Sequence, residues 1–427
     1  MLTKNLFNLK DIFSFISFLL IIYSVHLLNI YKIWGPNENA VIGLLACLAF
    51  LACSFKNNNQ CTNTLFKGTI TYYEKLLIVA LGSTLCIISL QNIIAPYPMD
   101  KTNSDVIPQM NILVNRFLSG VFPYTPIDFK TYTLFPTYLP IQWLPFCIAE
   151  LFGIDYRIFA LIVLLIAVAV YLNKFKNRAA FYIASVFVFG LIIIGMLYNK
   201  DDYFNCVENI IAAFYLAFAL SLLHSKNIWL QILLLSFCLF SRYSIVLWIP
   251  LYFIYIFINQ GLIQSIKGLG FLLLIFLSVY GIPFLSQDPS IFLKAYAYHT
   301  GAAIGEWKVD NSCNNCKPYH LNRGLGMAIF FYENQNNIAS RLSILQKVHL
   351  LLSLLSVGGT ALYLIVNKYI INKKNISAHL MIWSLALYLT IFYHFIQIPY
   401  HYLFSVPIVL YMVLFQSYFM PDKLVKK

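Results

Sequence analysis

Residues 180–198 read AFYIASVFVFGLIIIGMLY, nineteen positions without a charged side chain. As a helix at 1.5 Å per residue this stretch is about 28 Å long, close to the thickness of a bilayer hydrocarbon core. It therefore predicts a membrane-spanning helix. Comparable apolar runs lie near residues 12–30, 39–54, 76–94, 158–173, 206–223, 228–241, 243–258, 268–286, 346–366, 378–395 and 400–418. Together they predict an all-α polytopic membrane protein with about twelve transmembrane helices.

The composition agrees with a chain whose solvent is the bilayer. Of its 427 residues, 60% are hydrophobic and only 11% are charged, a balance too apolar for a soluble domain. We expect one integral membrane domain over residues 1–427. The first apolar run, residues 12–30, is too long for the core of a cleavable signal peptide and lacks an Ala-x-Ala-like exit, so we expect it to stay as a signal anchor.

The distribution of charge predicts the orientation. With a cytoplasmic amino terminus, the inner segments carry 16 of the 29 Lys and Arg residues but only three carboxylates, Asp11, Glu74 and Asp422. The outer side then holds 13 basic and 13 acidic residues. An excess of Lys and Arg in inner loops is the positive-inside pattern, which points to the inner (plasma) membrane. It also explains the net charge of +13 without a nucleic-acid partner.

Two long outer segments, residues 95–157 and 287–345, are the places where we expect function, with juxtamembrane helices in these loops. We interpret Tyr138–Gly153 as a helix lying along the membrane surface and interrupted by Pro140 and Pro145. The run over residues 228–259 is interpreted as two short helices that meet at Arg242, because one long helix would place this cation near the bilayer centre.

The first outer segment contains an ordered series of features. Asp105 follows a span by about ten residues, an amphipathic helix is predicted over residues 108–118, and Gly120 and the turn Phe122-Pro123-Tyr124 follow. A Tyr-x-Pro element comes next, and the segment ends as FGIDYR at residues 152–157. Over residues 100–173 this order resembles the GT-C superfamily of membrane glycosyltransferases. The series follows the third predicted span here, whereas in the family it usually follows the first.

The resemblance implies a reaction on the extracytoplasmic face. A hexose such as mannose would move from a polyprenyl-phosphate donor to a glycan, lipid or protein acceptor, and Asp105 would be the catalytic base. This chemistry benefits from a carboxylate that takes the acceptor proton and from cations that stabilise the departing phosphate. A solvated loop aspartate is the alternative interpretation of Asp105.

A second acidic group follows the span at residues 180–198. Asp201, Asp202 and Glu208 are candidates for orienting the acceptor or for holding a divalent cation, since carboxylate oxygens suit such ions. Whether the reaction needs a metal stays open. Interfacial polarity explains Asp201 or Asp202 taken singly equally well, whereas a buried Glu208 is more suggestive of function.

Three cations near the outer surface are candidates for binding the lipid phosphate: Arg242, Arg116 and Lys200. Arginine offers a fork of donors suited to phosphate oxygens. A structural ion pair between Arg242 and Glu208 is the alternative for the first of them. Arg157, also near this surface, is expected to pair with Asp155.

Aromatic and histidine side chains supply the candidate sugar-binding residues Tyr124, His394, His401 and Tyr402. The last three bracket a short outward turn, and an aromatic belt at the membrane interface explains them almost as well.

Cys313 and Cys316 form the one C-x-x-C motif, in an outer segment where a disulfide is favoured over a zinc site with His320 and His299. The sequence contains no Walker A loop, G-x-S-x-G, H-E-x-x-H or Rossmann glycine motif. A lipid-linked-glycan flippase or transporter remains the main alternative function, and a polysaccharide polymerase or ligase a third.

Overall fold

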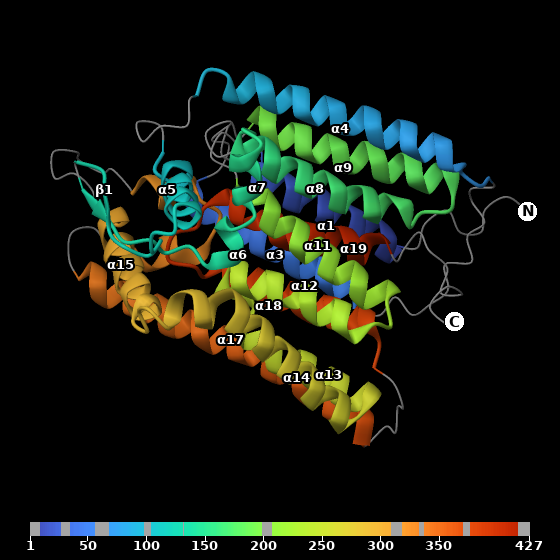
Figure 1. Ribbon diagram of the computed structural model, residues 1–427. Helices are drawn as coiled ribbons and strands as arrows, with labels where there is room; N and C mark the ends of the chain where they lie inside the picture. Colours follow the sequence, from blue (N-terminus) through green and yellow to red (C-terminus); the bar gives the residue numbers. More distant parts are fainter. Residues whose placement is uncertain are drawn as a thin grey trace, which may run out of the picture.

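A computed structural model describes residues 9–26, 35–55, 68–97, 104–130, 132–198, 207–308, 318–332, 337–369 and 376–416. The fold is all-helical apart from one small hairpin. The long bundle helices are α1 (Leu9–His26), α3 (Pro36–Ser54), α4 (Tyr72–Ile94), α8 (Tyr156–Asn173), α9 (Arg178–Tyr198), α11 (Asn209–His224), α12 (Ile228–Ser241), α13 (Ile249–Gln260), α14 (Leu262–Phe276), α17 (Ile338–Tyr369), α18 (Ala378–His394) and α19 (Ser405–Gln416). Most of them run side by side, as Figure 1 shows.

Helix length and apolarity show a membrane protein. Among the described residues, seven helices are long and apolar enough to cross a bilayer, and five further apolar helices are 10–17 residues long. Each of the twelve predicted runs falls on one of these helices. The number of crossings stays a prediction, because a helix of 14 residues such as α12 spans only about 21 Å.

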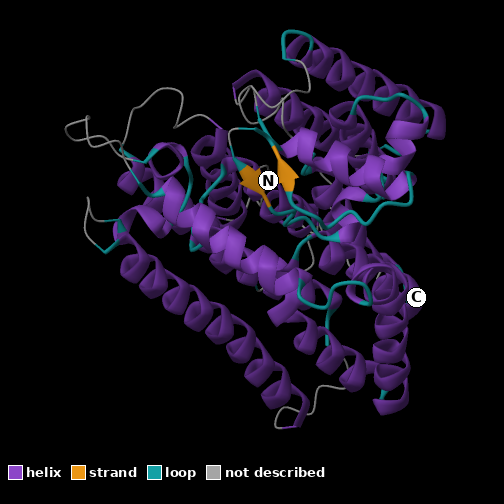
Figure 2. Cartoon of the chain, turned by 60° about the vertical axis from the view of Figure 1, so that its left-hand side comes forward, coloured by secondary structure: helices purple, strands orange, loops and turns teal. Residues whose placement is uncertain are grey.

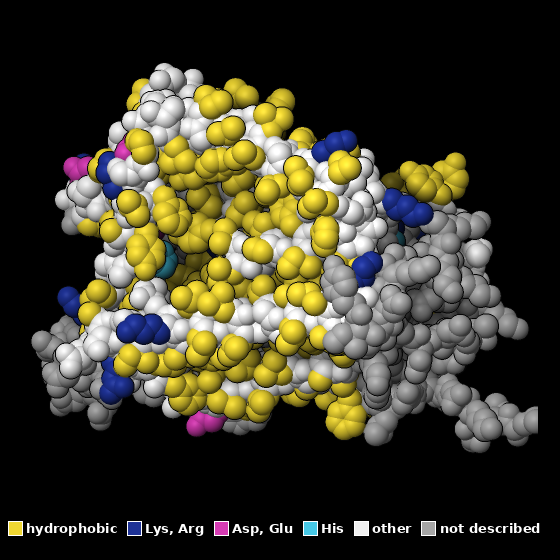
Figure 3. Space-filling model, turned by 90° about the horizontal axis from the view of Figure 1, so that it is seen from below, with side chains coloured by type: hydrophobic (Ala, Val, Ile, Leu, Met, Phe, Trp, Pro, Cys, Tyr) yellow, Lys and Arg dark blue, Asp and Glu magenta, His cyan; other side chains and the backbone are white. Residues whose placement is uncertain are grey.

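The surface of the bundle fits this environment. Leu350, Leu354 and Leu355 on α17 are between 50% and 60% exposed, as are Leu269 and Leu273 on α14. Leucines at this exposure would form a large aggregation-prone patch in water. Figure 3 shows apolar side chains across the middle of one face and Lys and Arg side chains toward its two ends. This is the distribution that lipid tails and headgroups require.

Helix α11 lies at the centre of the bundle and packs against α8, α12 and α19. Its residues are apolar around the whole circumference, and Ile211, Tyr215 and Phe218 are fully buried. A helix without a polar face has no surface to present to water, so it belongs in the interior. Its amino-terminal end is therefore held rigidly, and this end carries Glu208.

The first outer segment folds over one end of the bundle. Helix α5 (Val106–Leu118) is followed by strands β1 (Ile127–Asp128) and β2 (Thr133–Leu134), which pair antiparallel, and by α6 (Pro140–Trp143) and α7 (Phe146–Leu151). Figures 1 and 2 place the hairpin and α5 at the same end. The hairpin was not predicted, because two residues per strand leave no alternating pattern to detect.

Prolines divide the predicted surface helix as expected. Pro140 occupies the first turn of α6, where its missing N–H is harmless, and Pro145 separates α6 from α7. The predicted break at Arg242 is confirmed too. α12 ends at Ser241, Arg242 is extended, and a 3₁₀ helix, η1 (Tyr243–Trp248), leads into α13.

The second outer segment is also helical. After the π-helical η2 (Leu277–Leu285), it contains α15 (Ile291–Glu306), α16 (Tyr319–Arg323) and η3 (Met327–Phe331). Helix α17 begins at residue 338, earlier than the predicted 346, so this segment is shorter than the sequence suggested. The turn between α18 and α19 contains one more 3₁₀ helix, η4 (His401–Phe404). α15 lies at the same loop end of the bundle as α5 (Figure 1).

Candidate functional site

Asp105 lies at the amino-terminal end of α5, half-buried, and its carboxylate forms no capping bond to that helix. Instead Oδ2 accepts a hydrogen bond of 3.0 Å from the hydroxyl of Tyr132, at the start of β2. Burial, together with the negative charge and hydrogen bond of Asp105, raises the pKa of Tyr132 to about 12. The hydroxyl therefore stays protonated and keeps the carboxylate oriented as an acceptor.

A second group of charged side chains is a buried ion pair. Nη2 of Arg242 lies 2.6 Å from Oε1 of Glu208, and the Glu208 side chain is only 8% exposed. The same oxygen accepts a bond of 3.3 Å from Nε2 of Gln142, on α6. This pair joins α11 to the junction between α12 and η1, so the predicted alternative of an ion pair is what the structure contains.

Helix ends explain how two charges are held here. Glu208 is the residue preceding the first turn of α11, where the helix dipole is positive. Arg242 follows the last residue of α12, where the dipole is negative. Each charge thus complements its own helix. Within the described residues, Oε2 of Glu208 and Nη1 of Arg242 are buried without a hydrogen-bond partner, so the pair keeps one acceptor and one donor for another group.

Tyr138 interacts electrostatically with both Asp105 and this ion pair. Burial raises the pKa of Tyr138 well above its usual value, and the negative charges of Asp105 and Glu208 raise it further while Arg242 opposes them. One phenol is therefore within electrostatic range of all three charged side chains. Since they come from α5, α11 and the end of α12, this loop residue marks the point where the elements converge.

Further aromatic side chains surround this point. Tyr400 and Tyr402 stack with their ring centroids 5.1 Å apart and their planes 15° from parallel. Tyr402 interacts electrostatically with both Glu208 and Arg242. From α15, Tyr298 faces Asp105, and burial together with the charge of Arg242 lowers the pKa of His299. The cluster of Asp105, Tyr132, Tyr138, Glu208, Arg242 and Tyr402 is called the charged cluster below.

The sequence identified four of these six residues as candidates. Asp105, Glu208, Arg242 and Tyr402 were candidates, and the structure brings them together. Tyr132 and Tyr138 were missed as site residues, as were Tyr298 and His299. The Tyr-x-Pro element ending at Pro140 was a usable signal for Tyr138, whereas Tyr132 carried none, because its position depends on the hairpin.

Three other candidates lie in structural positions. Tyr124 is 3% exposed, and its hydroxyl donates to the Tyr138 carbonyl at 2.9 Å and accepts from Trp143 Nε1 at 3.1 Å. Arg116 donates to the carbonyls of Pro123, Thr125 and Pro126. Both side chains therefore hold the 120–126 turn in place. Arg157 pairs with Asp155 at 2.6 Å, as expected from the sequence.

The two histidine candidates, His394 and His401, are not part of the charged cluster. His394 is fully buried, its Nδ1 is 2.8 Å from the carbonyl oxygen of Thr390, and its ring meets Phe404 edge-on. A fully buried ring in such contacts stabilises the packing of α18. His401 is 8% exposed, at the start of η4.

The remaining candidates, Lys200, Asp201, Asp202, Cys313 and Cys316, lie outside the described residues. Across the part of the chain that the structure describes, no three His, Cys, Asp or Glu side chains are grouped as metal ligands. Oε1 of Glu208 is bonded to Arg242 and Gln142 there. A divalent-cation role for Asp201, Asp202 and Glu208 stays a prediction.

Comparisons with known proteins add no relative. No protein-family model matches the chain, and neither a curated protein nor a solved structure matches it.

Proposed function

We propose that the protein is a hexosyltransferase that uses a polyprenyl-phosphate sugar as donor and acts on the extracytoplasmic face. The observation that carries the proposal is the convergence of Asp105, Glu208 and Arg242 around Tyr138. A base and a phosphate-binding cation are the two groups that glycosyl transfer from a phosphate requires. Both lie at the loop end of the bundle, where a lipid-linked donor meets water.

The proposed reaction is a single displacement. An acceptor hydroxyl oxygen bonds to the anomeric carbon of the sugar while the bond from that carbon to the phosphate oxygen breaks. The acceptor proton passes to the carboxylate of Asp105, and the electron pair of the broken bond leaves with the polyprenyl phosphate. Asp105 is suited to this role because its carboxylate is half-buried and makes no capping bond to α5.

Arg242 is the proposed phosphate ligand. Its Nη1 has no hydrogen-bond partner among the described residues, whereas Nη2 is held by Glu208. Glu208 thus fixes the guanidinium plane and leaves one edge for a phosphate oxygen. A guanidinium held in this way loses little side-chain entropy when the ligand arrives.

The stacked pair Tyr400 and Tyr402 is the proposed sugar platform. Hexose rings have apolar C–H faces and polar edges, which match an aromatic face bordered by hydroxyl groups. Tyr402 is in electrostatic range of Arg242, so a sugar on this platform would place its phosphate toward the guanidinium. His401, beside Tyr402, belongs to the same turn.

A flippase or transporter is the alternative that the same features permit, because a buried ion pair also occurs in transport pathways. The two functions differ in outcome: a transferase cleaves the bond from sugar to phosphate, and a flippase moves the intact lipid. A conversion assay therefore decides between them.

The experiment uses the purified full-length chain in lipid nanodiscs with radiolabelled polyprenyl-phosphate mannose and, separately, glucose. Envelope lipid and glycan extracts serve as acceptors, and product is followed by release of label from the carrier. The substitution Asp105→Asn should lower turnover about 10²- to 10⁴-fold, the usual contribution of a general base.

Asp128→Asn is the matched control. It makes the same change in the same outer segment, at an exposed side chain whose one hydrogen bond among the described residues is accepted from the Lys130 backbone N–H in its own turn. It should keep turnover unchanged. If folded Asp105→Asn protein retains full turnover, Asp105 is not the base. If the wild-type chain releases no label yet transfers intact lipid between leaflets, the flippase is the correct function.

A further inference from the structure

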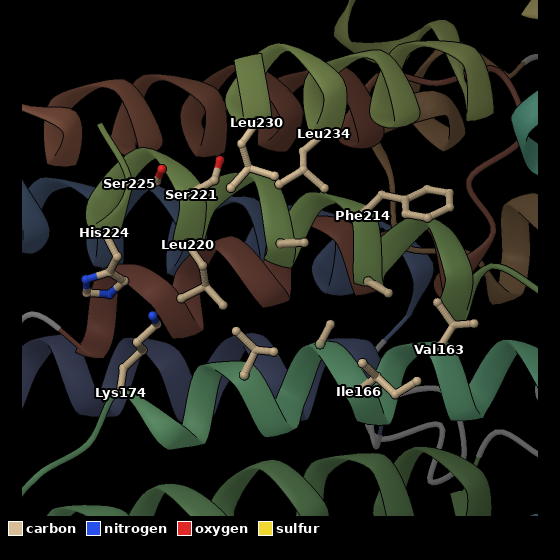
Figure 4. A pocket seen from close by; sticks show the side chains of 14 residues that line it. Val163, Ile166, Lys174, Phe214, Leu220, Ser221, His224, Ser225, Leu230 and Leu234 are labelled. Atoms are coloured by element: carbon tan, nitrogen blue, oxygen red, sulfur yellow. The ribbon is translucent and has the colours of Figure 1, made fainter. Parts of the chain in front are cut away.

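A hollow lies in the half of the bundle away from the charged cluster. It has a volume of about 350 Å³ and is formed by α8, α11 and α12 (Figure 4). It extends from Val163 to Lys174 along α8. Since α8 begins next to the first outer segment, Lys174 marks the end of the groove farthest from that segment.

The walls of this groove are apolar and open to the bilayer. Ile166 and Val170 on α8 are 60% and 48% exposed, and Leu230 on α12 is 40% exposed. Ala217, on α11, also lines the groove. Its small side chain leaves space beside the larger apolar ones, which suits a hydrocarbon chain. Within a membrane such a groove is filled by lipid rather than by water.

One end of the groove is polar. Lys174, His224 and Ser225 lie there, and Figure 4 shows the Lys174 amine and the His224 ring directed toward each other. The two are close enough for the charge of Lys174 to act on the imidazole. No carboxylate lines the groove, and in the described part of the chain neither side chain takes part in an ion pair.

The Lys174 ammonium has no carboxylate in the groove to balance its charge, so an anion bound beside it would be favourable. A further cation, the exposed Lys226, directly follows Ser225. A basic site between helices at the end of an apolar groove has the chemistry of an anionic lipid headgroup site.

We infer that this groove is a specific site for one anionic glycerophospholipid of the leaflet opposite the charged cluster. One acyl chain lies along Ile166, Ala217 and Leu230, and the phosphate accepts hydrogen bonds from Lys174 and His224. The site differs from the proposed donor site in leaflet, residues and ligand, so it holds whether or not the chain transfers sugars. Its role is to fix α8 against α11 and α12.

The test is native mass spectrometry of the full-length chain released from detergent after addition of phosphatidylglycerol and phosphatidylcholine with identical acyl chains. The wild type should retain one phosphatidylglycerol in preference to phosphatidylcholine. Lys174→Gln should reduce that retention roughly fivefold, the effect of one cation near an anionic headgroup. Lys176→Gln, which removes the same charge two positions away and outside the groove, should leave it unchanged.

A second variant tests the apolar part of the groove. Ala217→Phe places a ring in the groove and should reduce retention of both lipids, while elution on size exclusion remains that of the wild type. Equal retention of the two lipids by the wild type, equal losses in Lys174→Gln and Lys176→Gln, or full retention by Ala217→Phe would each overturn the site.

Discussion

Arg242 and Glu208 join the carboxy-terminal end of α12 to the amino-terminal end of α11 through an ion pair of 2.6 Å. Both side chains are largely buried, at 19% and 8% exposure. Removing one partner from such a pair leaves an uncompensated charge in a poorly solvated site. The pair therefore has a structural role beside the phosphate-binding role proposed for Arg242, and the two roles can be separated.

The single substitution Arg242→Met should lower the free energy of unfolding by about 3–5 kcal/mol, because Glu208 loses its countercharge. The double variant Arg242→Met with Glu208→Leu should recover most of that loss, since two apolar side chains replace the pair. Thermal unfolding in detergent measures both. Hexosyl transfer should be absent in each, because the phosphate ligand is missing. A stable double variant with full turnover would leave Arg242 without a catalytic role.

Tyr132→Phe tests the hydrogen bond to Asp105. The hydroxyl, whose pKa is raised to about 12, donates at every pH below that value. The same donor orients the carboxylate of Asp105 as an acceptor, so its removal should lower kcat about tenfold and leave the KM for the lipid-linked sugar near the wild-type value. Steady-state kinetics of the folded variant measure both constants. A raised KM with unchanged kcat would place Tyr132 in substrate binding and not in the support of Asp105.

Tyr124→Phe distinguishes support of the turn from sugar binding. The substitution leaves Trp143 Nε1 and the Tyr138 carbonyl without their bonds to the phenol. Leaving buried polar groups unpaired costs about 1–3 kcal/mol, so the midpoint of thermal unfolding should fall. The KM for the lipid-linked sugar should stay at the wild-type value in protein that remains folded. A raised KM without loss of stability would return Tyr124 to the sugar site.

Local chemistry explains why part of the fold was predictable. Arg242 interrupts a long apolar run, and a cation in the middle of one span is costly, so two helices were expected and are found. Pro140 and Pro145 divide the surface helix for an equally local reason. Neither prediction needs the position of any distant residue.

The partners of the charged side chains depended on tertiary structure instead. Arg116 binds three carbonyls only because the chain reverses at Gly120, whose φ of +72° lies in the left-handed region. Tyr138 interacts electrostatically with both Asp105 and Glu208 because α5, α11 and the loop meet at one end of the bundle. The spacing of residues along a single sequence does not give those distances. The phosphate-binding role predicted for Arg116 could therefore not be tested from the sequence.

Orientation in the membrane remains the expectation on which the proposed function depends most. Asp128 in β1 and Lys176 between α8 and α9 are both exposed. β1 lies at the loop end of the bundle, and Lys176 follows the carboxy-terminal end of α8, away from that loop end (Figure 1). Cysteine is introduced at one position at a time, in a background whose reactive native cysteines are replaced. On intact cells a membrane-impermeant maleimide should label Asp128→Cys and leave Lys176→Cys unmodified, because inner segments carry the excess of Lys and Arg.

Labelling after membrane disruption is the control, and it should modify both positions equally. This makes the comparison independent of how reactive each thiol is. Label at Lys176→Cys but not at Asp128→Cys on intact cells would put Asp105 and Arg242 on the cytoplasmic side. Nucleotide sugars are available there, so a polyprenyl-phosphate donor would no longer be required, and the proposed hexosyl transfer would lose its physical basis.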